Sequence, residues 1–448
     1  GDKSVVGVDL EPGRKMSLGL RTVELSEPLT QAEARSAAAE LTADPRVKYA
    51  EPDYLAQPMM DVAPASATSP NDTYYNPPNA FMWGLNTTYG IDAPDAWALT
   101  TGSSSVVVAV LDTGIRTHED LDATKQLPGY DMISDTLIAN DGNVRDADPT
   151  DPGDGVTQGA LDGGLSELSP GCPVRDSSWH GMHVTGTINA STDNGLGVAS
   201  VAPGVKVEPV RVLGRCGGFT SDIVDAIVWA SGGTVAGVPD NANPADIINM
   251  SLGSQQACTN SYQTAIDAAV ASGTTVVAAG GNSNVDVAGA SPASCNNVIA
   301  VGAIGEDGKR ADFSNYGAGI DLSAPGALIA STTNVGLLGP GADNYMFMSG
   351  TSQAAPHVAG LAALMKSRFP ALTPAQVEAR LKTYVKAFPA DTCDPVANKN
   401  HCGTGIANAE AVTTGLVPGV PSAVTATAHN GSVDVSWTAP DDSGSTII

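Results

Sequence analysis

The sequence predicts a three-layer α/β/α fold in which a mainly parallel central sheet lies between two layers of helices. Residues 106–111 are a continuous apolar segment, and four further segments read similarly, as strands do when both faces of a sheet are covered. Helical patterns separate them, and strands that alternate with helices along a chain form parallel sheets. The expected strands are residues 106–111, 205–213, 246–252, 275–279 and 298–303, and the expected helices are 183–189, 221–230, 261–272 and 354–368.

The first 60 residues carry more charge than the segment that follows. Thr30-Gln-Ala-Glu33 is a capping box, in which the Thr and Glu side chains satisfy the first free N–H groups of a helix, and an Ala-rich run follows it. Residues 22–25 and 46–50 read as short strands. We therefore interpret residues 1–60 as a small α+β unit.

Composition also divides the rest of the chain. Residues 61–80 are rich in Pro, Ala, Ser, Thr and Asn, which is typical of an exposed linker. The α/β pattern fills residues 81–415. In the tail, residues 416–448, two alternating segments surround Asn430-Gly431, a favoured hairpin turn. About thirty residues are too few for a β-sandwich of ~100 residues, so the tail is interpreted as the start of a further domain.

Charge and hydropathy narrow the classes of partner. Asp and Glu number 48 against 22 Lys and Arg, which gives a formal net charge of −26. An acidic surface repels nucleic acid and anionic membranes, so neither is an expected partner. No apolar run approaches the ~20 residues of a membrane-spanning helix. We expect a monomer.

The cysteines favour an oxidising compartment. Their number, six, is even and none forms a CxxC pair, so a zinc site is disfavoured. Disulfides in a secreted protein are the favoured interpretation, and six buried free thiols are the alternative. The six are Cys172, Cys216, Cys258, Cys295, Cys393 and Cys402.

Two motifs place polar side chains at element boundaries. In Val108-Ala-Val-Leu-Asp112-Thr-Gly114, Asp112 follows a buried strand, at the sheet edge where open α/β folds bind ligands. Taken alone, such an Asp is more often a cap or turn residue. In His180-Gly-Met-His183-Val-Thr-Gly186, His180 begins a helix. A metal pair is disfavoured because no Glu follows the first His, and His183 is interpreted as a core histidine.

A third motif places a serine at the start of a helix. It reads Gly350-Thr-Ser352-Gln-Ala-Ala-Pro356-His357-Val-Ala-Gly360. Backbone N–H groups and the positive end of the helix dipole would face Ser352, which suits a nucleophile whose product is an oxyanion. A simple N-cap serine is the alternative. The motif is not the G-x-S-x-G elbow of α/β hydrolases.

Together the motifs supply the three parts of a serine hydrolase. Serine is a weak nucleophile without an adjacent histidine base, and the histidine needs a carboxylate to fix its tautomer. Asp112, His180 and Ser352 follow one another in a chain order known for this triad. Residues 81–415 thus resemble the subtilase, or subtilisin-like, serine peptidases, whose three active-site signatures these motifs match nearly residue for residue. Met182 stands where the family usually has Thr, and Gln353 where it usually has Met.

The resemblance implies a secreted endopeptidase that acts on extended protein or peptide substrates without a catalytic cofactor. Asn282 would be the oxyanion-hole donor, a role worth roughly 2.7–4 kcal/mol in the transition state. Small residues at the substrate edge would let a substrate backbone approach and add a strand. The implied substrate-binding residues are Gly217, Gly218, Ser251, Leu252, Gly253, Ala279, Gly280, Gly281 and Ala290.

The ends of the chain carry further resemblances. Residues 1–60 resemble the later part of the family's inhibitory propeptide, so this unit is expected to cover the cleft until the chain is cut within about 59–70. Trp437-Thr-Ala-Pro440 resembles the opening of a fibronectin type III domain. Six cysteines permit fifteen pairings. The subtilase arrangement implies the disulfides Cys172–Cys216 and Cys258–Cys295, and Cys393–Cys402 is expected as the remaining, local pair.

A structural calcium site is expected in an acidic loop. Calcium takes six to eight oxygen ligands, and this loop has almost no apolar residues to order it. The candidate ligands are Asp141, Asp146, Asp148, Asp151 and Asp154. A solvated acidic loop is an equal alternative. A second candidate site is Asp120 with Asp193 or Asn194, which resemble the family's common calcium site.

Two rival functions remain open at this point. A subtilase fold that has lost catalysis and serves for binding predicts a broken triad, whereas all four catalytic residues are present. A different hydrolase, such as an esterase, is disfavoured by the segments that resemble the binding edges for extended peptide.

Overall fold

A computed structural model describes residues 4–5, 8–25, 29–53, 55–58, 74–75, 80–390, 392–393, 401–414, 422–429 and 432–438. The statements below concern these residues.

The predicted parallel sheet is present and has seven strands in the order β13-β12-β11-β9-β5-β7-β6. Each neighbouring pair runs parallel. Because parallel strands end at the same edge, residues that follow them converge there. The strands are β5 (Val107–Asp112), β6 (Tyr130–Asp131), β7 (Lys206–Arg211), β9 (Ile247–Met250), β11 (Thr275–Ala279), β12 (Ile299–Ile304) and β13 (Leu322–Pro325).

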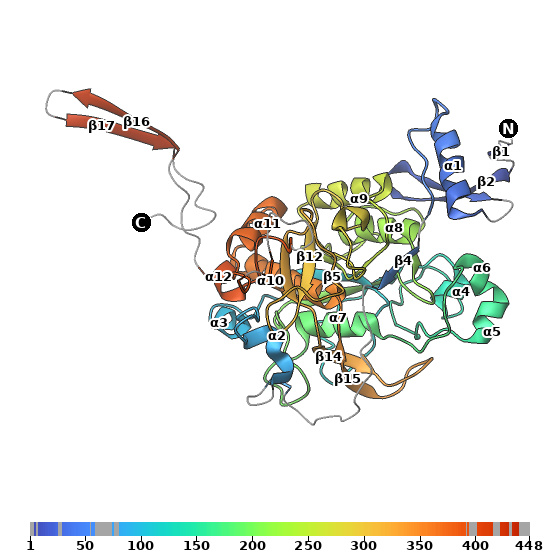
Figure 1. The fold of residues 1–448 in the computed structure, drawn as a ribbon, viewed down its shortest axis with the longest axis horizontal. Helices are drawn as coiled ribbons and strands as arrows, with labels where there is room; N and C mark the ends of the chain where they lie inside the picture. The colour runs from blue at the N-terminus through green and yellow to red at the C-terminus, as the bar shows by residue number, and fades with distance from the viewer. Residues whose placement is uncertain are drawn as a thin grey trace.

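Helices cover both faces of this sheet (Figure 1). Alternate residues of a strand point to opposite faces, so β5 contributes Val108 and Val110 to one core, with α7 and α10, and Ala109 and Leu111 to the other, with α8 and α9. These four helices begin close to where they were expected. They are α7 (His180–Asn189), α8 (Thr220–Ala230), α9 (Asn260–Ala271) and α10 (Thr351–Arg368).

Shorter elements complete the central domain. A capping box opens α11, with Thr373 at the N-cap and Gln376 at the third position. The remaining helices are η2 (Ala80–Met82), α2 (Trp83–Asn86), α3 (Ala93–Trp97), α4 (Thr136–Ala139), α5 (Gln158–Ala160), η3 (Leu161–Leu165), α6 (Ser166–Leu168), η4 (Val287–Gly289), α11 (Pro374–Thr383) and α12 (Ala409–Thr413). The remaining strands are β8 (Gly218–Phe219), β10 (Leu252–Gly253), β14 (Ile329–Asn334) and β15 (Asp343–Met348).

The N-terminal unit is α+β, as expected, and lies beside α8 and α9 (Figure 1). The capping box at Thr30 and Glu33 is formed. The strand expected at residues 46–50 is wrong, because the Asp44 carboxylate and carbonyl accept N–H groups from the next residues and close a turn there. The unit contains β1 (Ser4–Val5), β2 (Val8–Lys15), η1 (Ser17–Gly19), β3 (Arg21–Leu25), α1 (Gln31–Thr42) and β4 (Leu55–Pro58).

The tail contains the two expected strands, β16 (Ser422–His429) and β17 (Ser432–Thr438), which pair antiparallel. The Asn430-Gly431 turn and the segment predicted to be cut on maturation lie outside the described residues. Among the helices that the structure describes, none is long and apolar enough to cross a membrane.

The three expected disulfides are present. They join Cys172 to Cys216, Cys258 to Cys295 and Cys393 to Cys402. The first ties the segment that precedes α7 to the residues that lead into β8. Both of these chain segments therefore have a covalent tether close to the proposed substrate edge.

Candidate active site

Asp112 and His180 meet at the carboxyl edge of the sheet. Asp112 is the last residue of β5 and His180 the first of α7, and neither side chain is exposed. His180 Nδ1 lies 2.7 Å from Asp112 Oδ1, so the carboxylate holds the Nδ1–H tautomer. His180 Nε2 has no hydrogen-bond partner among the described residues. This nitrogen is therefore free to accept a proton.

Ser352 lies in the first turn of α10 and exchanges hydrogen bonds with Ser251. Ser352 Oγ donates to the Ser251 carbonyl, and Ser251 Oγ donates to the Ser352 carbonyl, each over 2.8 Å. The second bond satisfies a carbonyl that the helix cannot, because Pro356 has no N–H to return to Ser352. Ser352 Oγ thus points to Ser251 and not to His180 Nε2. Bonds between catalytic groups commonly tighten only when substrate binds.

The Asn282 side chain is held with its amide N–H groups free. Its Oδ1 accepts from the Thr351 backbone N–H and hydroxyl, each over 2.9 Å. Asn282 Nδ2 is buried without a hydrogen-bond partner among the described residues. Because both Thr351 groups donate, the end of the Asn282 amide that faces them must be the oxygen. The free Nδ2 is therefore an available donor on a side chain bonded to Thr351, the residue before Ser352.

The proposed substrate edges enclose a strand of the protein's own N-terminal unit. β4 lies between β10 and β8 and runs antiparallel to both. In this register Pro58 and Gln57 face Leu252 and Gly253, and Ala56 faces Gly218. The cleft thus accepts an extended chain as a middle strand, the mode called β-augmentation.

The other predicted pocket residues gather after β11. Gly280 donates its N–H to the Val301 carbonyl over 2.9 Å, and Gly281 has a φ of 104°. A Cβ on Gly281 would lie 3.7 Å from the Ala290 Cβ, so Ala290 adjoins this turn as expected. Ala279, the last residue of β11, and Ala290 are both buried.

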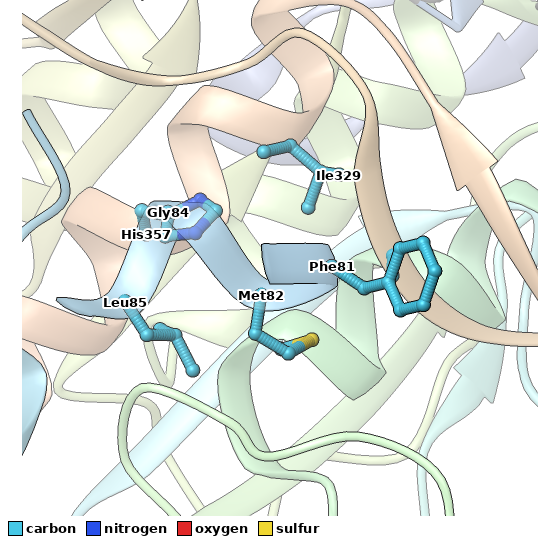
Figure 2. A pocket seen from close by; sticks show the side chains of 7 residues that line it. Phe81, Met82, Gly84, Leu85, Ile329 and His357 are labelled. Atoms are coloured by element: carbon cyan, nitrogen blue, oxygen red, sulfur yellow. The ribbon is translucent and has the colours of Figure 1, made fainter. Parts of the chain in front are cut away.

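The two further histidines of the motifs lie outside the catalytic contacts. His183 Nε2 donates to the Ile329 and Met346 carbonyls, at 2.9 and 3.2 Å, and burial lowers the pKa of His183 to about 3. His357 lies on α10 in a small cavity against η2 and α2 (Figure 2). Burial lowers the pKa of His357 to about 4. Both are neutral core histidines, as was expected for His183.

The acidic loop does not assemble the calcium site first predicted. Within the described part of the chain no group of three or more His, Cys, Asp or Glu side chains could hold a metal ion. Arg211 Nη1 pairs with Asp141 over 2.7 Å as well as with the buried Asp131, and backbone N–H groups occupy Asp146 Oδ1 and Asp148 Oδ1. The carboxylates of this loop can be counted in the sequence, but the arginine that pairs with one of them lies 70 residues away in the chain. The predicted set was Asp141, Asp146, Asp148, Asp151 and Asp154.

Asp151 and Asp154 instead support the catalytic segments. Asp151 Oδ2 accepts from the Thr113 hydroxyl at 2.7 Å, and Thr113 Oγ1 accepts from the Gly181 N–H at 3.0 Å. Asp154 Oδ1 accepts from the Ser178 N–H at 2.6 Å. The residues next to Asp112 and His180 are therefore fixed by buried carboxylates of this loop.

The second calcium candidate brings its residues together. Asp120 is buried, and its two oxygens accept from Asn194 Nδ2 at 2.7 Å and from the Val198 N–H at 2.9 Å. No ion pair to Asp120 occurs among the described residues. Burial raises the pKa of Asp120 to about 6, against the effect of these two bonds. A buried carboxylate with only neutral donors is a fitting ligand for a cation.

Several residues of the site were not predicted from the sequence. Thr351 orients Asn282, and Thr113 links the acidic loop to Gly181. Both residues belong to the motifs given above. A threonine next to a catalytic residue has no sequence pattern that would reveal its hydrogen-bond partner. β4 was also missed, because Leu55–Pro58 is too short for an alternating pattern.

Comparisons with known proteins agree with this geometry. Residues 103–405 match the model of the family described as "Subtilase family". The chain is 46% identical over 419 residues to "Extracellular protease" of Xanthomonas campestris pv. campestris, covering 93% of this chain and 68% of that protein. It is 44% identical over 363 residues to "Extracellular basic protease" of Dichelobacter nodosus, covering 81% of this chain and 58% of that protein.

A third relative and a solved structure show the same likeness. "Subtilisin Savinase" of Lederbergia lenta is 35% identical over 332 residues, which covers 74% of this chain and 98% of that protein. A solved structure of proteases from Pseudoalteromonas arctica PAMC 21717 is 48% identical with a TM-score of 0.70. It covers 77% of this chain and 99% of that chain.

Proposed function

Since this chain belongs to the subtilase family, and is a secreted serine endopeptidase, we propose that Ser352 is its nucleophile, His180 its general base and Asp112 the carboxylate that orients His180. The observation that carries this assignment is the 2.7 Å contact between His180 Nδ1 and Asp112 Oδ1, which leaves Nε2 free. Asn282, with a free buried Nδ2, is the proposed oxyanion donor.

The reaction proceeds in two halves. Ser352 Oγ leaves its bond to Ser251 and attacks the scissile carbonyl carbon, while His180 Nε2 takes the hydroxyl proton. Asn282 Nδ2 donates to the oxyanion that forms. His180 then gives the proton to the leaving amine, and the C–N bond breaks to leave an acyl-enzyme on Ser352. Water, deprotonated by His180, attacks the ester carbonyl carbon, the bond to Ser352 Oγ breaks and releases the acid, and His180 returns the proton to Ser352 Oγ.

Extended polypeptide is the proposed substrate class, because β4 already occupies the cleft as an antiparallel strand between β8 and β10. The matured enzyme should cleave casein and an internally quenched peptide with a far higher kcat/KM than a p-nitrophenyl ester. An enzyme that prefers the ester would be an esterase, and a chain inactive on both would be a binding protein with an idle triad.

We further propose that the N-terminal unit, residues 1–60, is an intramolecular inhibitor. Besides the strand β4 in the cleft, Glu51 accepts N–H groups of Asn260 and Ser261 at the start of α9. Asp53 accepts the N–H of Ser221 at the start of α8, over 2.8 Å. Carboxylates at these two positions are favourable because free N–H groups and the helix dipole face them.

The register of β4 suggests which bond is cut. Pro58 faces Leu252, and the residue before Leu252 is Ser251, the partner of Ser352. We propose that the bond after Met59 is hydrolysed on maturation. N-terminal sequencing of the active form should then begin at Met60, and an active form that still begins at residue 1 would contradict the inhibitor role.

Structural calcium is proposed at Asp120, not in the acidic loop. Asp120 would be the charged ligand and Asn194, already beside it, a second ligand, and the ion would supply the missing positive charge. Calcium should raise the melting temperature of the protein, and Asp120→Asn should abolish the rise. The Asp148→Asn control should leave it intact.

Two further proposals concern the oligomeric state and the C-terminal tail. We propose that the protein is a monomer, which sedimentation equilibrium of the Ser352→Ala chain would test. We also propose that residues 416–448 begin a fibronectin type III domain, since β16 and β17 form a hairpin of the expected kind.

A further inference from the structure

Two aspartates of α8 are buried where the N-terminal unit meets the peptidase domain. Asp222 and Asp225 are three residues apart on this helix, so they lie on one face of it. Neither side chain is exposed to solvent. Figure 1 shows α8 beside the blue elements of the N-terminal unit. Two buried negative charges this close require positive partners.

Two arginines, one from each side of the contact, share these carboxylates. Arg14 of β2 donates from Nη2 to Asp222 Oδ1 at 2.8 Å and from Nη1 to Asp225 Oδ2 at 2.5 Å. Arg145 of the peptidase domain donates to the same two oxygens, at 2.6 and 2.9 Å. Each guanidinium therefore spans both carboxylates, and the four charges cancel.

The remaining oxygens divide between the two parts of the protein. Asp222 Oδ2 accepts from the Ser134 N–H and hydroxyl, each over 3.0 Å, and so stays satisfied within the peptidase domain. Asp225 Oδ1 accepts from the Ser17 N–H and hydroxyl, each over 2.8 Å. Both of these donors belong to the N-terminal unit.

Departure of the unit would therefore change the cluster unequally. Both aspartates would lose Arg14 and keep Arg145, so one negative charge would stay uncompensated. Asp222 would also keep Ser134, whereas Asp225 would lose both Ser17 donors. Burial acts to raise the pKa of Asp225, but Arg145, Ser17 and Arg14 together hold it below its ordinary value.

We propose that Asp222 and Asp225 form a guanidinium receptor by which the peptidase domain recognises its own N-terminal unit, with Arg14 as the determinant. The inference rests on the proposed inhibitory role of residues 1–60. A guanidinium suits the site because its two Nη groups reach two carboxylates at once, whereas an ammonium is a single point charge. Recognition by this pair is separate from the cleft contacts of β4 and from the helix caps.

The test uses the full chain with Ser352→Ala, which cannot cut itself. A fluorescein-labelled peptide that copies residues 52–59 competes with β4 for the cleft, and fluorescence polarisation gives its Kd. Arg14→Met should tighten peptide binding on the order of ten- to hundredfold, because the docked unit loses a buried charge pair. Arg21→Met is the matched control and should change nothing, since the one partner of the Arg21 guanidinium among the described residues is the Gly13 carbonyl of its own unit.

Two more variants separate recognition from misfolding. Asp225→Asn should tighten peptide binding as well, and adding it to Arg14→Met should give much less than the product of the two effects. The peptide Kd of Arg14→Lys should lie between that of the parent chain and that of Arg14→Met. If Arg14→Met and Arg21→Met bind the peptide equally, the receptor proposal is wrong. The inhibitory role still holds in that case, provided that the parent chain excludes the peptide. If the parent binds the peptide as tightly as the chain freed of its unit, the inhibitory role fails too.

Discussion

Glu208 lies in the interior of the central sheet and should make the stability of this protein depend on pH. It is a β7 residue with no exposed surface, and it has one described partner, Asn241 Nδ2, which donates to Oε2 at 2.8 Å. Burial raises the pKa of Glu208 from 4.5 to about 8. The side chain is therefore neutral in the folded protein at pH 7 and ionised in the unfolded chain.

The sign and size of the effect follow from this difference. Between pH 4.5 and about 8 the folded state binds one proton more than the unfolded state, so stability falls as pH rises through this window. At 1.36 kcal/mol for each pKa unit, the total loss is on the order of 4–5 kcal/mol. Glu208→Gln removes the titration, so the variant should gain roughly this much on the wild type between pH 4.5 and pH 9.

Thermal unfolding in the Ser352→Ala background, which prevents autolysis, measures the difference. For a domain of this size we expect the melting temperatures of Glu208→Gln and its parent to diverge by about 5–10 °C across the pH range. An offset that does not vary with pH would reflect the new amide alone. Glu306→Gln, at an exposed position, is the control and should follow its parent at every pH. Parallel curves for Glu208→Gln and its parent would refute the reasoning.

Three substitutions test the geometry around the nucleophile. Asn282→Ala should lower kcat about 10²–10³-fold with little change in KM, the loss typical for an oxyanion donor in proteases of this family, whereas Asn296→Ala should leave kcat unchanged. Asp154→Asn should weaken the bond that fixes the segment before His180 and lower kcat several-fold, and Asp148→Asn, in the same loop, should not. Ser251→Ala should leave the buried carbonyl of the nucleophile without a donor, which should lower the free energy of unfolding by about 1–3 kcal/mol. If a variant and its control have the same kcat, or if Ser251→Ala unfolds with an unchanged free energy, the corresponding contact does not have the proposed effect.

The fold could be predicted because its signals are local and repeated. Strands such as Val107–Asp112, which is apolar up to its last residue, are typical of a parallel sheet with both faces covered. The capping boxes at Thr30 and Thr373 fix helix starts from side chains three residues apart. The strand expected at residues 46–50 failed because a local Asp turn outweighed a weak alternation.

Residues of the candidate site could be predicted only where they belong to a recognisable sequence motif. Asp112 and His180 are brought together by strands and helices whose ends the sequence already marked. The acidic loop shows the limit, since its carboxylates look alike in sequence but have different partners. Arg211, distant in the chain, pairs with Asp141, while Asp154 accepts a backbone N–H from the segment before the catalytic histidine. Long-range charge pairing leaves no periodic trace in a sequence.

The central claim is that Ser352 forms the acyl-enzyme, and covalent labelling tests it most directly. The matured enzyme, treated with a fluorophosphonate and digested, should yield one labelled peptide, with the modification on Ser352. Ser349→Ala, three residues away in the chain, should label normally. The full chain with Ser352→Ala, cut and freed of its N-terminal unit by added wild-type enzyme, should not label at all. Labelling that survives Ser352→Ala, or that maps to another residue, would contradict the account.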